Sequence, residues 1–352
     1  MHERPIHRRH GWGLLAGGLA VGSVCALLVI QAISPSRHGT AQLVTATREA
    51  TPTPTGQPSP SATPTPTPAR TKAPDPYPGA AYLVEGGDLP DVPYRPRTSA
   101  AKHDRPVTYD NGCHQAQLAP AVITCAFGPK DAQRTIAVVG DSHSAEWLPA
   151  LQSVADDLSW RIVSITKSGC RFEIYPADNV KHQSCRDWNA GVLNRLRTLR
   201  PDVVFTLATV GSSGSDSMHA GTVFSRWRAL EEMGIPVVAI RDNPWYKFDL
   251  AECVATYGPR SSRCGGDRAQ HGLTHPITVP HGYTLPANVH LLDLTNYYCE
   301  RTFCPAVVGN VLVYRDDHHL TATFVKTAAP YLAAAIITAM GWQHPRPART
   351  PV

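Results

Sequence analysis

Five short apolar runs, each followed by a segment that can form an amphipathic helix, constrain the fold of this chain most strongly. The runs span residues 135–142, 161–167, 202–210, 235–242 and 289–295. Near-continuous Val, Ile and Leu are typical of strands buried on both faces, and alternation with helices indicates parallel strands joined by right-handed crossovers. The pattern predicts an α/β fold: a three-layer α/β/α sandwich around a parallel, five-stranded, flavodoxin-like sheet.

The segments that flank these runs predict one exported domain over residues 79–345. Residues 79–130 should wrap onto the sandwich as a lead-in, and no internal repeat is visible. One closing helix is expected over residues 321–341, ending at Gly341 as helices commonly do. Residues 346–352 then form a short tail.

The N-terminal region predicts a membrane anchor. Residues 12–33 carry no charge, and about 20 apolar residues suffice to cross a hydrocarbon core of about 30 Å. The basic residues 1–11 should remain as a cytoplasmic tail, which places everything after residue 33 outside the cytoplasm. A cleaved signal peptide is the alternative, although the run is longer than a usual signal-peptide core and no clear A-x-A site follows it.

A Pro/Thr-rich linker is predicted over residues 34–78. From Thr51 onward, Pro and Thr alternate with almost nothing apolar to bury. Such a chain cannot offset the entropy of ordering, so we expect a disordered, extended stalk between the membrane and the domain.

The cysteines predict four disulfides in an oxidising compartment. Of nine cysteines, Cys25 lies in the apolar run, and an even number follows the export segment, which favours disulfides over metal ligands. No C-x-x-C occurs, which argues against a zinc ribbon or a thioredoxin-like site. The expected pairs are sequence neighbours: Cys113 with Cys125, Cys170 with Cys185, Cys253 with Cys264, and Cys299 with Cys304.

The overall charge points to no nucleic-acid partner. The formal net charge is +5, and no Lys/Arg-rich run with interleaved aromatic residues occurs.

The turn after the first predicted strand carries a candidate nucleophile. The sequence VVGDSHSAEW places Ser142 where a side chain projects into the crevice of the sheet and its own backbone N–H can face a developing oxyanion. The alternative is structural: Ser142 or Ser144 caps the helix, and Gly140 only makes the turn.

A candidate base for this serine lies near the C-terminus, in YRDDHHLT. Asp316 and His319 stand three residues apart, so the carboxylate can orient the imidazole while the ring faces the serine. Thr321 is the expected cap of the closing helix.

These blocks resemble the SGNH hydrolase superfamily, which has GDS after its first strand and D-x-x-H before its last helix. More narrowly, CAFGPKDAQRTIAVVGDSHSAEWLPAL, TKSGC, CRDWN and YRDDHHLT resemble the SGNH domain at the extracytoplasmic end of acyltransferase-3 type proteins, which O-acylate cell-surface glycans. The resemblance covers about residues 80–340.

The resemblance implies that Ser142 is the nucleophile and that Asp316 and His319 complete a triad. Leu320 and Thr321 follow His319 as the motif requires, which favours His319 over His318. Ser142 and Gly169 are the implied oxyanion donors. The family's Asn after strand three is absent, and the backbone of residues 209–211 is the substitute that we expect.

Four further residues are weaker candidates for substrate binding. They stand at strand ends, where ligands of such folds bind: Asp141, His143, Thr209 and Asp242. A structural role is the alternative for His143, and a simple Asn-Pro turn is the alternative for Asp242. Clustered Asp and His residues can bind metal, but adjacent residues rarely face one ion, so we predict neither metal nor cofactor.

The resulting hypothesis is a membrane-anchored, extracytoplasmic serine O-acyltransferase or esterase that acts on O-acyl, above all acetyl, groups of cell-envelope glycans. The acyl group would come from a separate membrane acyl-donor protein, or the domain would hydrolyse an ester with water. A catalytically inactive glycan-binding module is the alternative.

Overall fold

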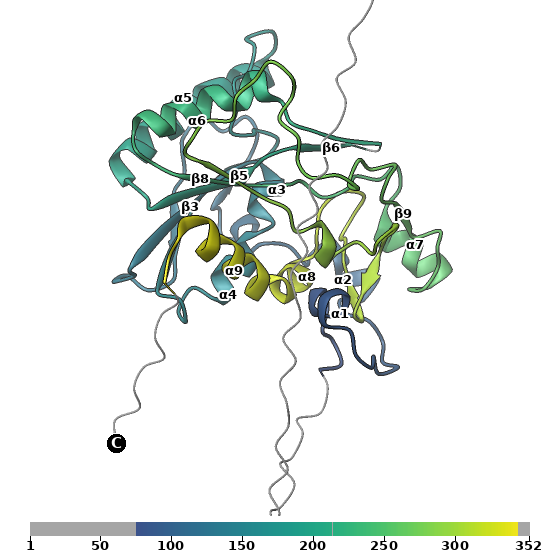
Figure 1. Cartoon of the computed structure of the whole chain (residues 1–352). Helices are drawn as coiled ribbons and strands as arrows, with labels where there is room; N and C mark the ends of the chain where they lie inside the picture. The colour runs from purple at the N-terminus through teal and green to yellow at the C-terminus, as the bar shows by residue number, and fades with distance from the viewer. Residues whose placement is uncertain (1–74, 213, 344–352) are drawn as a thin grey trace, which may run out of the picture. The chain divides into compact units, whose positions relative to one another are not determined.

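The computed structural model describes residues 75–212 and 214–343 (Figure 1). Five parallel strands form the centre of its main sheet. In spatial order they are β4 (Trp160–Lys167), β3 (Arg134–Gly140), β5 (Val203–Leu207), β8 (Val237–Ile240) and β10 (Val289–Leu292). This is the doubly wound order 2-1-3-4-5 of flavodoxin-like sheets. The predicted α/β fold with a mostly parallel sheet is therefore confirmed.

The sheet has seven strands, which corrects the expected five. Strand β1 (His114–Gln115) pairs parallel with the end of β4, and β2 (Cys125–Phe127) pairs antiparallel with its middle. Both come from the lead-in segment, which thus closes the outer edge of β4. Strands of two or three residues are too short to show a hydrophobic period, so sequence reasoning could not find them.

Helices cover both faces of the sheet (Figure 1). On one face, α5 (Val180–Leu199) and α6 (Ala220–Glu232) share a core with Ala137 and Val139 of β3. The intervening Ile136 and Val138 lie in a second core, on the opposite face. Its helices are α4 (Leu148–Ser153), α8 (Ala322–Thr327) and α9 (Ala329–Met340). Side chains alternate across a strand, so β3 builds both cores at once.

The expected closing helix is broken into α8 and α9 at Ala328. Pro330 explains the break, because its ring collides with the carbonyl four residues earlier and it has no N–H to donate. The two predicted ends of the closing helix are confirmed. The Thr321 hydroxyl accepts a hydrogen bond from the Phe324 amide at 3.1 Å, and Gly341 ends α9 in a left-handed conformation.

The remaining elements are short and lie mainly in connections. They are α1 (Ala80–Glu85), α2 (Thr98–Ala101), η1 (Val107–Tyr109), α3 (Ser142–Ala145), β6 (Val210–Ser212), β7 (Ser215–Ser217), α7 (Leu250–Tyr257), β9 (Gly265–Asp267), η2 (Thr295–Tyr297), β11 (Phe303–Pro305), β12 (Val307–Val308) and β13 (Val311–Leu312).

All four predicted disulfides are present in the structure. They join Cys113 to Cys125, Cys170 to Cys185, Cys253 to Cys264, and Cys299 to Cys304. The bridge between Cys170 and Cys185 covalently links the loop after β4 to helix α5. It lies close to the end of β3.

The predicted cytoplasmic tail, the membrane segment over residues 12–33 and nearly all of the linker lie outside the described residues. Within residues 75–212 and 214–343, no helix has both the length and the apolar character needed to cross a membrane.

Removing the bridge between Cys170 and Cys185 with a double Cys→Ser change should lower the free energy of unfolding by about 3 kcal/mol, because the bridge closes a loop of about 15 residues in the unfolded chain. The same change at Cys299 and Cys304, which are separated by only five positions, should lower it by about 2 kcal/mol. Urea unfolding of the two variants and the parent protein checks this order. A larger loss at Cys299 and Cys304 would contradict it.

Candidate active site

A tight turn at the end of β3 presents Ser142. Gly140 has φ 141°, and a Cβ atom there would lie 2.2 Å from the Ser144 hydroxyl, so only glycine fits. The Asp141 carboxylate caps α3, accepting hydrogen bonds from the amides of His143 at 3.1 Å and Ser144 at 3.4 Å. The capping alternative for Ser142 and Ser144 is therefore wrong, and the Ser142 hydroxyl is free for another partner.

Ser142, His319 and Asp316 form a continuous hydrogen-bonded chain. His319 Nε2 lies 2.9 Å from Ser142 Oγ, although the two residues are 177 positions apart. On the other side of the ring, His319 Nδ1 lies 2.9 Å from Asp316 Oδ2. The order hydroxyl, imidazole, carboxylate is that of a serine-hydrolase triad.

A local turn sets the spacing between Asp316 and His319. One carboxylate oxygen of Asp316 accepts hydrogen bonds from the backbone amides of His318 at 3.0 Å and His319 at 2.7 Å. The Arg315 amide closes the turn by donating to the His319 carbonyl at 2.9 Å. An Asp that bonds to amides two and three residues later stabilises such turns, so the D-x-x-H spacing directs the imidazole back onto its own carboxylate.

The protonation states suit a neutral base beside a charged carboxylate. Burial opposes the charge of Asp316, yet hydrogen bonds from the His319 ring and from two amides hold the pKa of Asp316 well below its usual range. Burial lowers the pKa of His319 to about 4, and the Asp316 carboxylate opposes this only in part. At neutral pH, His319 is therefore an uncharged imidazole that can accept a proton.

The neighbouring His318 is placed differently. Its Nδ1 lies 2.8 Å from Asp317, and its ring lies tilted against those of His319 and Trp245. Among the residues that the structure describes, His319 is the one imidazole that hydrogen-bonds to the Ser142 hydroxyl.

Gly169 lies at the same edge of the sheet as Ser142. Gly140 pairs with Thr166 in the register of β3 and β4, so the chain reaches Gly169 three residues beyond the paired position. Neither the Gly169 amide nor the Ser142 amide donates a hydrogen bond to another residue within 75–212 and 214–343. Both amides remain available for an oxyanion.

Part of the segment expected to supply a third oxyanion donor is already hydrogen-bonded. The Gly211 amide donates to Asp242 Oδ2 at 2.9 Å, and the Thr209 carbonyl accepts from Arg171 Nη2 at 2.8 Å. The Thr209 hydroxyl also accepts from the Asp242 amide. The Gly211 amide is therefore already used within the loop, and the expectation that the backbone of residues 209–211 supplies a donor stays a prediction for Thr209.

A buried cluster lies directly behind the triad. His143 Nδ1 is 2.8 Å from Asp242 Oδ1 and 3.8 Å from Glu146 Oε1, and the three side chains are 2% exposed or less. Despite burial, the two carboxylates raise the pKa of His143 to about 10. Burial raises the pKa of Glu146 to about 8, whereas His143 and Arg171 overcome burial and lower that of Asp242.

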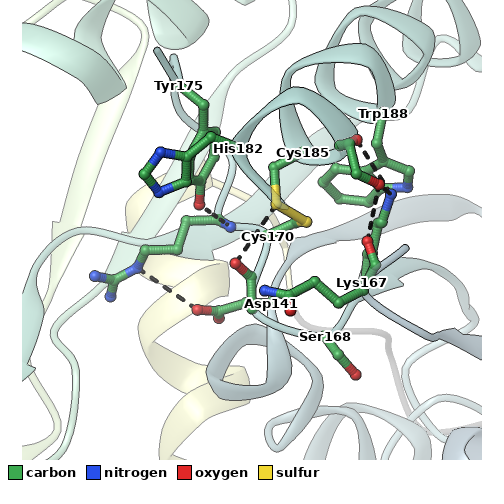
Figure 2. Close-up of a disulfide and its surroundings, with 12 residues drawn as sticks. Asp141, Lys167, Ser168, Cys170, Tyr175, His182, Cys185 and Trp188 are labelled. Atoms are coloured by element: carbon green, nitrogen blue, oxygen red, sulfur yellow. Dashed lines mark hydrogen bonds and ion pairs between the residues drawn. A yellow bond between two sulfur atoms is a disulfide. The ribbon is translucent and has the colours of Figure 1, made fainter. Parts of the chain in front are cut away.

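Arg171 connects the Cys170–Cys185 loop with this cluster. Its guanidinium lies 3.6 Å from Asp141 and 3.4 Å from Asp242. Figure 2 shows Asp141 beside the disulfide, with Tyr175 and His182 in the same surroundings. Sequence reasoning missed Arg171, because no motif marks an arginine whose partners come from two other strand ends. Glu146 was missed for the same reason.

The four weaker candidates do not lie open to a ligand. His143, Thr209 and Asp242 are at most 3% exposed, and Asp141 is occupied by helix capping. Their hydrogen bonds favour a supporting role beneath the site over direct contact with substrate.

Three groups of side chains are close enough to share a metal ion: His143 with His318 and His319; His143 with Glu146 and Asp242; and Asp316 with Asp317 and His318. The imidazoles of His143 and His318 stack with an angle of 12° between their planes. Ring nitrogens bind a metal in the plane of the ring, and nearly parallel planes do not converge on one ion. The absence of a metal remains a prediction.

Comparison with known proteins identifies the family. The model of the SGNH domain fused to AT3 domains matches residues 112–334. The fold can also be superposed on a solved structure, the periplasmic domain of a lipopolysaccharide acetyltransferase from Salmonella ser. Paratyphi A, with TM-score 0.44 and 16% identity over 73% of this chain and 94% of that one. No curated protein matches the chain. The family match spans more than half of the sequence, so the chain belongs to the SGNH domain family.

Proposed function

We propose that this SGNH-domain protein is a serine-dependent O-acyltransferase or esterase that acts on acyl groups, above all acetyl, of cell-envelope glycans. The observation that carries the proposal is the contact of 2.9 Å between His319 Nε2 and Ser142 Oγ, with Asp316 behind the ring. A serine hydroxyl is a weak nucleophile until a positioned base accepts its proton, and this arrangement supplies that base.

The proposed reaction has two halves. The Ser142 oxygen attacks the ester carbonyl carbon while its proton passes to His319, and the amides of Ser142 and Gly169 receive the oxyanion. The bond to the leaving alcohol then breaks, and His319 returns the proton to that alcohol. In the second half, an acceptor hydroxyl loses its proton to His319 and attacks acyl-Ser142. The bond from the acyl carbon to Ser142 Oγ then breaks, and His319 gives the proton to that oxygen, which restores the free serine. Asp316 orients the imidazole and stabilises its charge.

The acceptor decides between the two activities. A sugar hydroxyl makes the protein a transferase, and water makes it an esterase. Family membership supports a glycan substrate, because the family's domains occur fused to AT3 domains. We therefore propose a separate membrane protein as the acyl donor in the transfer reaction.

Four disulfides support a location outside the cytoplasm, since such bridges form and persist in oxidising compartments. We propose that the uncharged segment 12–33 holds the domain at the outer face of the membrane.

The test is the mass of the full chain, intact and after digestion to peptides, following incubation with 4-nitrophenyl acetate. We expect one added acetyl group on a peptide that contains Ser142, and release of 4-nitrophenol. Ser142→Ala should give neither the adduct nor turnover, whereas Ser144→Ala, two positions away, should keep both. An adduct elsewhere, or equal turnover by the parent protein and Ser142→Ala, would exclude the proposal.

A catalytically silent glycan-binding module is the second candidate, because one expected oxyanion donor in the loop after β5, the Gly211 amide, is already bonded to Asp242. The same assay separates the two, since a binding module gives neither adduct nor Ser142-dependent turnover.

A further inference from the structure

We propose that His143 is a positioning residue that holds a buried positive charge beside the catalytic base His319 and thereby keeps that base unprotonated in mildly acidic surroundings. This inference rests on the proposed function. It goes beyond that function because the His143 ring, which hydrogen-bonds to Asp242 and not to the Ser142 hydroxyl, is only 2% exposed.

The position of His143 suits an imidazolium better than a neutral ring. Asp242 lies 2.8 Å from its Nδ1, and Glu146 lies 3.8 Å away on the same helix. A buried carboxylate without a cation is strongly destabilising, so Asp242 favours the charged form of its partner. Against the effect of burial, Asp242 and, to a smaller extent, Glu146 raise the pKa of His143 to about 10. Because burial raises the pKa of Glu146 to about 8 while that of Asp242 is lowered, Asp242 is the charged partner of His143 in mildly acidic surroundings.

His143 lies directly against the base. The centres of the His143 and His319 rings are 4.8 Å apart, and the Trp245 ring stacks on His143 at 4.8 Å. His143 is 2% exposed, so little solvent screens its interaction with His319. A positive charge at this distance opposes a second positive charge on His319.

The surroundings of the two rings contain charges of both signs. Asp141, Glu146 and Asp242 face His143; Asp316 and Arg315 act on His319; and His318, paired with Asp317, stacks beside both rings. Arg171 also contacts Asp141 and Asp242. Asp316 favours protonation of His319, whereas His143 and Arg315 oppose it.

The cluster also holds the loop that carries the base. Glu146 Oε2 accepts a hydrogen bond from the Leu320 amide at 3.0 Å, directly after His319. The Asn243 side chain, next to Asp242, donates to the His318 carbonyl. The charge and the base are therefore kept at a constant separation by contacts on both sides of His319.

The sign of the effect follows from the charge. A base that must be unprotonated gives an acidic limb in the pH profile of kcat/KM, and this limb reports the pKa of the base in the free enzyme. A nearby cation lowers that pKa, so turnover continues to lower pH. Removal of the cation raises the pKa of His319 and moves the limb to higher pH.

The test is the pH profile of 4-nitrophenyl acetate turnover by the full chain with His143→Asn. Asparagine keeps a donor near the position of Nδ1 for Asp242 but carries no charge. We expect the midpoint of the acidic limb to rise by at least about half a pH unit. A midpoint within about 0.2 pH unit of the parent value, in a folded variant, would overturn the inference.

His114→Asn is the matched control. His114 is a half-buried histidine, and burial lowers its pKa to about 4, so it carries no charge in neutral and mildly acidic solution. Its replacement removes a ring without removing a charge, and the midpoint should stay in place. An equal shift in both variants would show loosened packing and overturn the inference.

The measurements also distinguish failure of the proposed function from failure of the role of His143. If the parent protein and Ser142→Ala turn the ester over equally, the proposed function fails. If turnover depends on Ser142 but the limb does not move in His143→Asn, only the role of His143 fails. Should His143→Asn not fold, His143→Gln, which places a donor nearer to Nε2, takes its place in the same measurement.

Discussion

His319→Ala should lower kcat for 4-nitrophenyl acetate by about 10⁴-fold or more, whereas His318→Ala should leave kcat within a few-fold of the parent value. The two rings are adjacent in sequence, and their centres are only 4.0 Å apart. Their contacts differ: His319 lies between Ser142 and Asp316, whereas His318 is paired with Asp317. A base that does not reach the nucleophile cannot take its proton.

Steady-state kinetics at neutral pH checks this asymmetry, with the folded fraction of each variant measured by circular dichroism. The two variants are matched, since each removes one imidazole from the same turn. Equal losses in both would show that the loop, and not one particular ring, is required. A larger loss in His318→Ala would exclude His319 as the base.

Asp242→Ala should lower the free energy of unfolding by about 3–5 kcal/mol, because removing one partner of a buried pair leaves an uncompensated charge. Asp242 receives bonds from His143 at 2.8 Å and from the Gly211 amide at 2.9 Å, and Arg171 lies 3.4 Å away. The variant would leave the buried Gly211 amide without its acceptor and remove the carboxylate paired with His143, whereas Arg171 would keep the Thr209 carbonyl and Asp141.

Asp317→Ala is the control for this change. Asp317 also pairs with a histidine at 2.8 Å, but its side chain is 49% exposed. Exposed pairs contribute between about 0 and 1 kcal/mol, so this variant should unfold close to the parent midpoint in urea. Similar losses for both variants would contradict a special role of burial. If Asp242→Ala does not fold, Asp242→Asn, which keeps an oxygen acceptor, should fold with a smaller loss.

Much of the fold could be predicted because it depends on patterns within short stretches. The five central strands are runs of Val, Ile and Leu, and the four disulfides join cysteines at most 15 positions apart. The ends of the closing helix follow from the chemistry of Thr321 and Gly341, whereas the break at Ala328 depends on Pro330 and was not predicted. Strands β1 and β2 escaped prediction because they are ordered by the free edge of β4 rather than by their own residues.

The candidate site also has one part that local sequence patterns predict and another that they do not. The sequence alone determined the turn that brings His319 onto Asp316, because one carboxylate bonds to amides two and three residues later. It also determined that Ser142 stands at a strand end. Only the tertiary structure decided that the Gly211 amide is already used, because its acceptor Asp242 lies 31 positions away.

The buried cluster around His143 shows why such contacts could not be predicted from the sequence. His143 and Asp242 are 99 positions apart, and Arg171 comes from a third strand end. Their charges interact strongly only when folding excludes water and brings opposite charges within about 4 Å of each other. Local hydrogen bonds can be read from spacing, because neighbouring residues cannot separate. Long-range ion pairs depend on packing of the whole sheet, and that is settled only once the chain has folded.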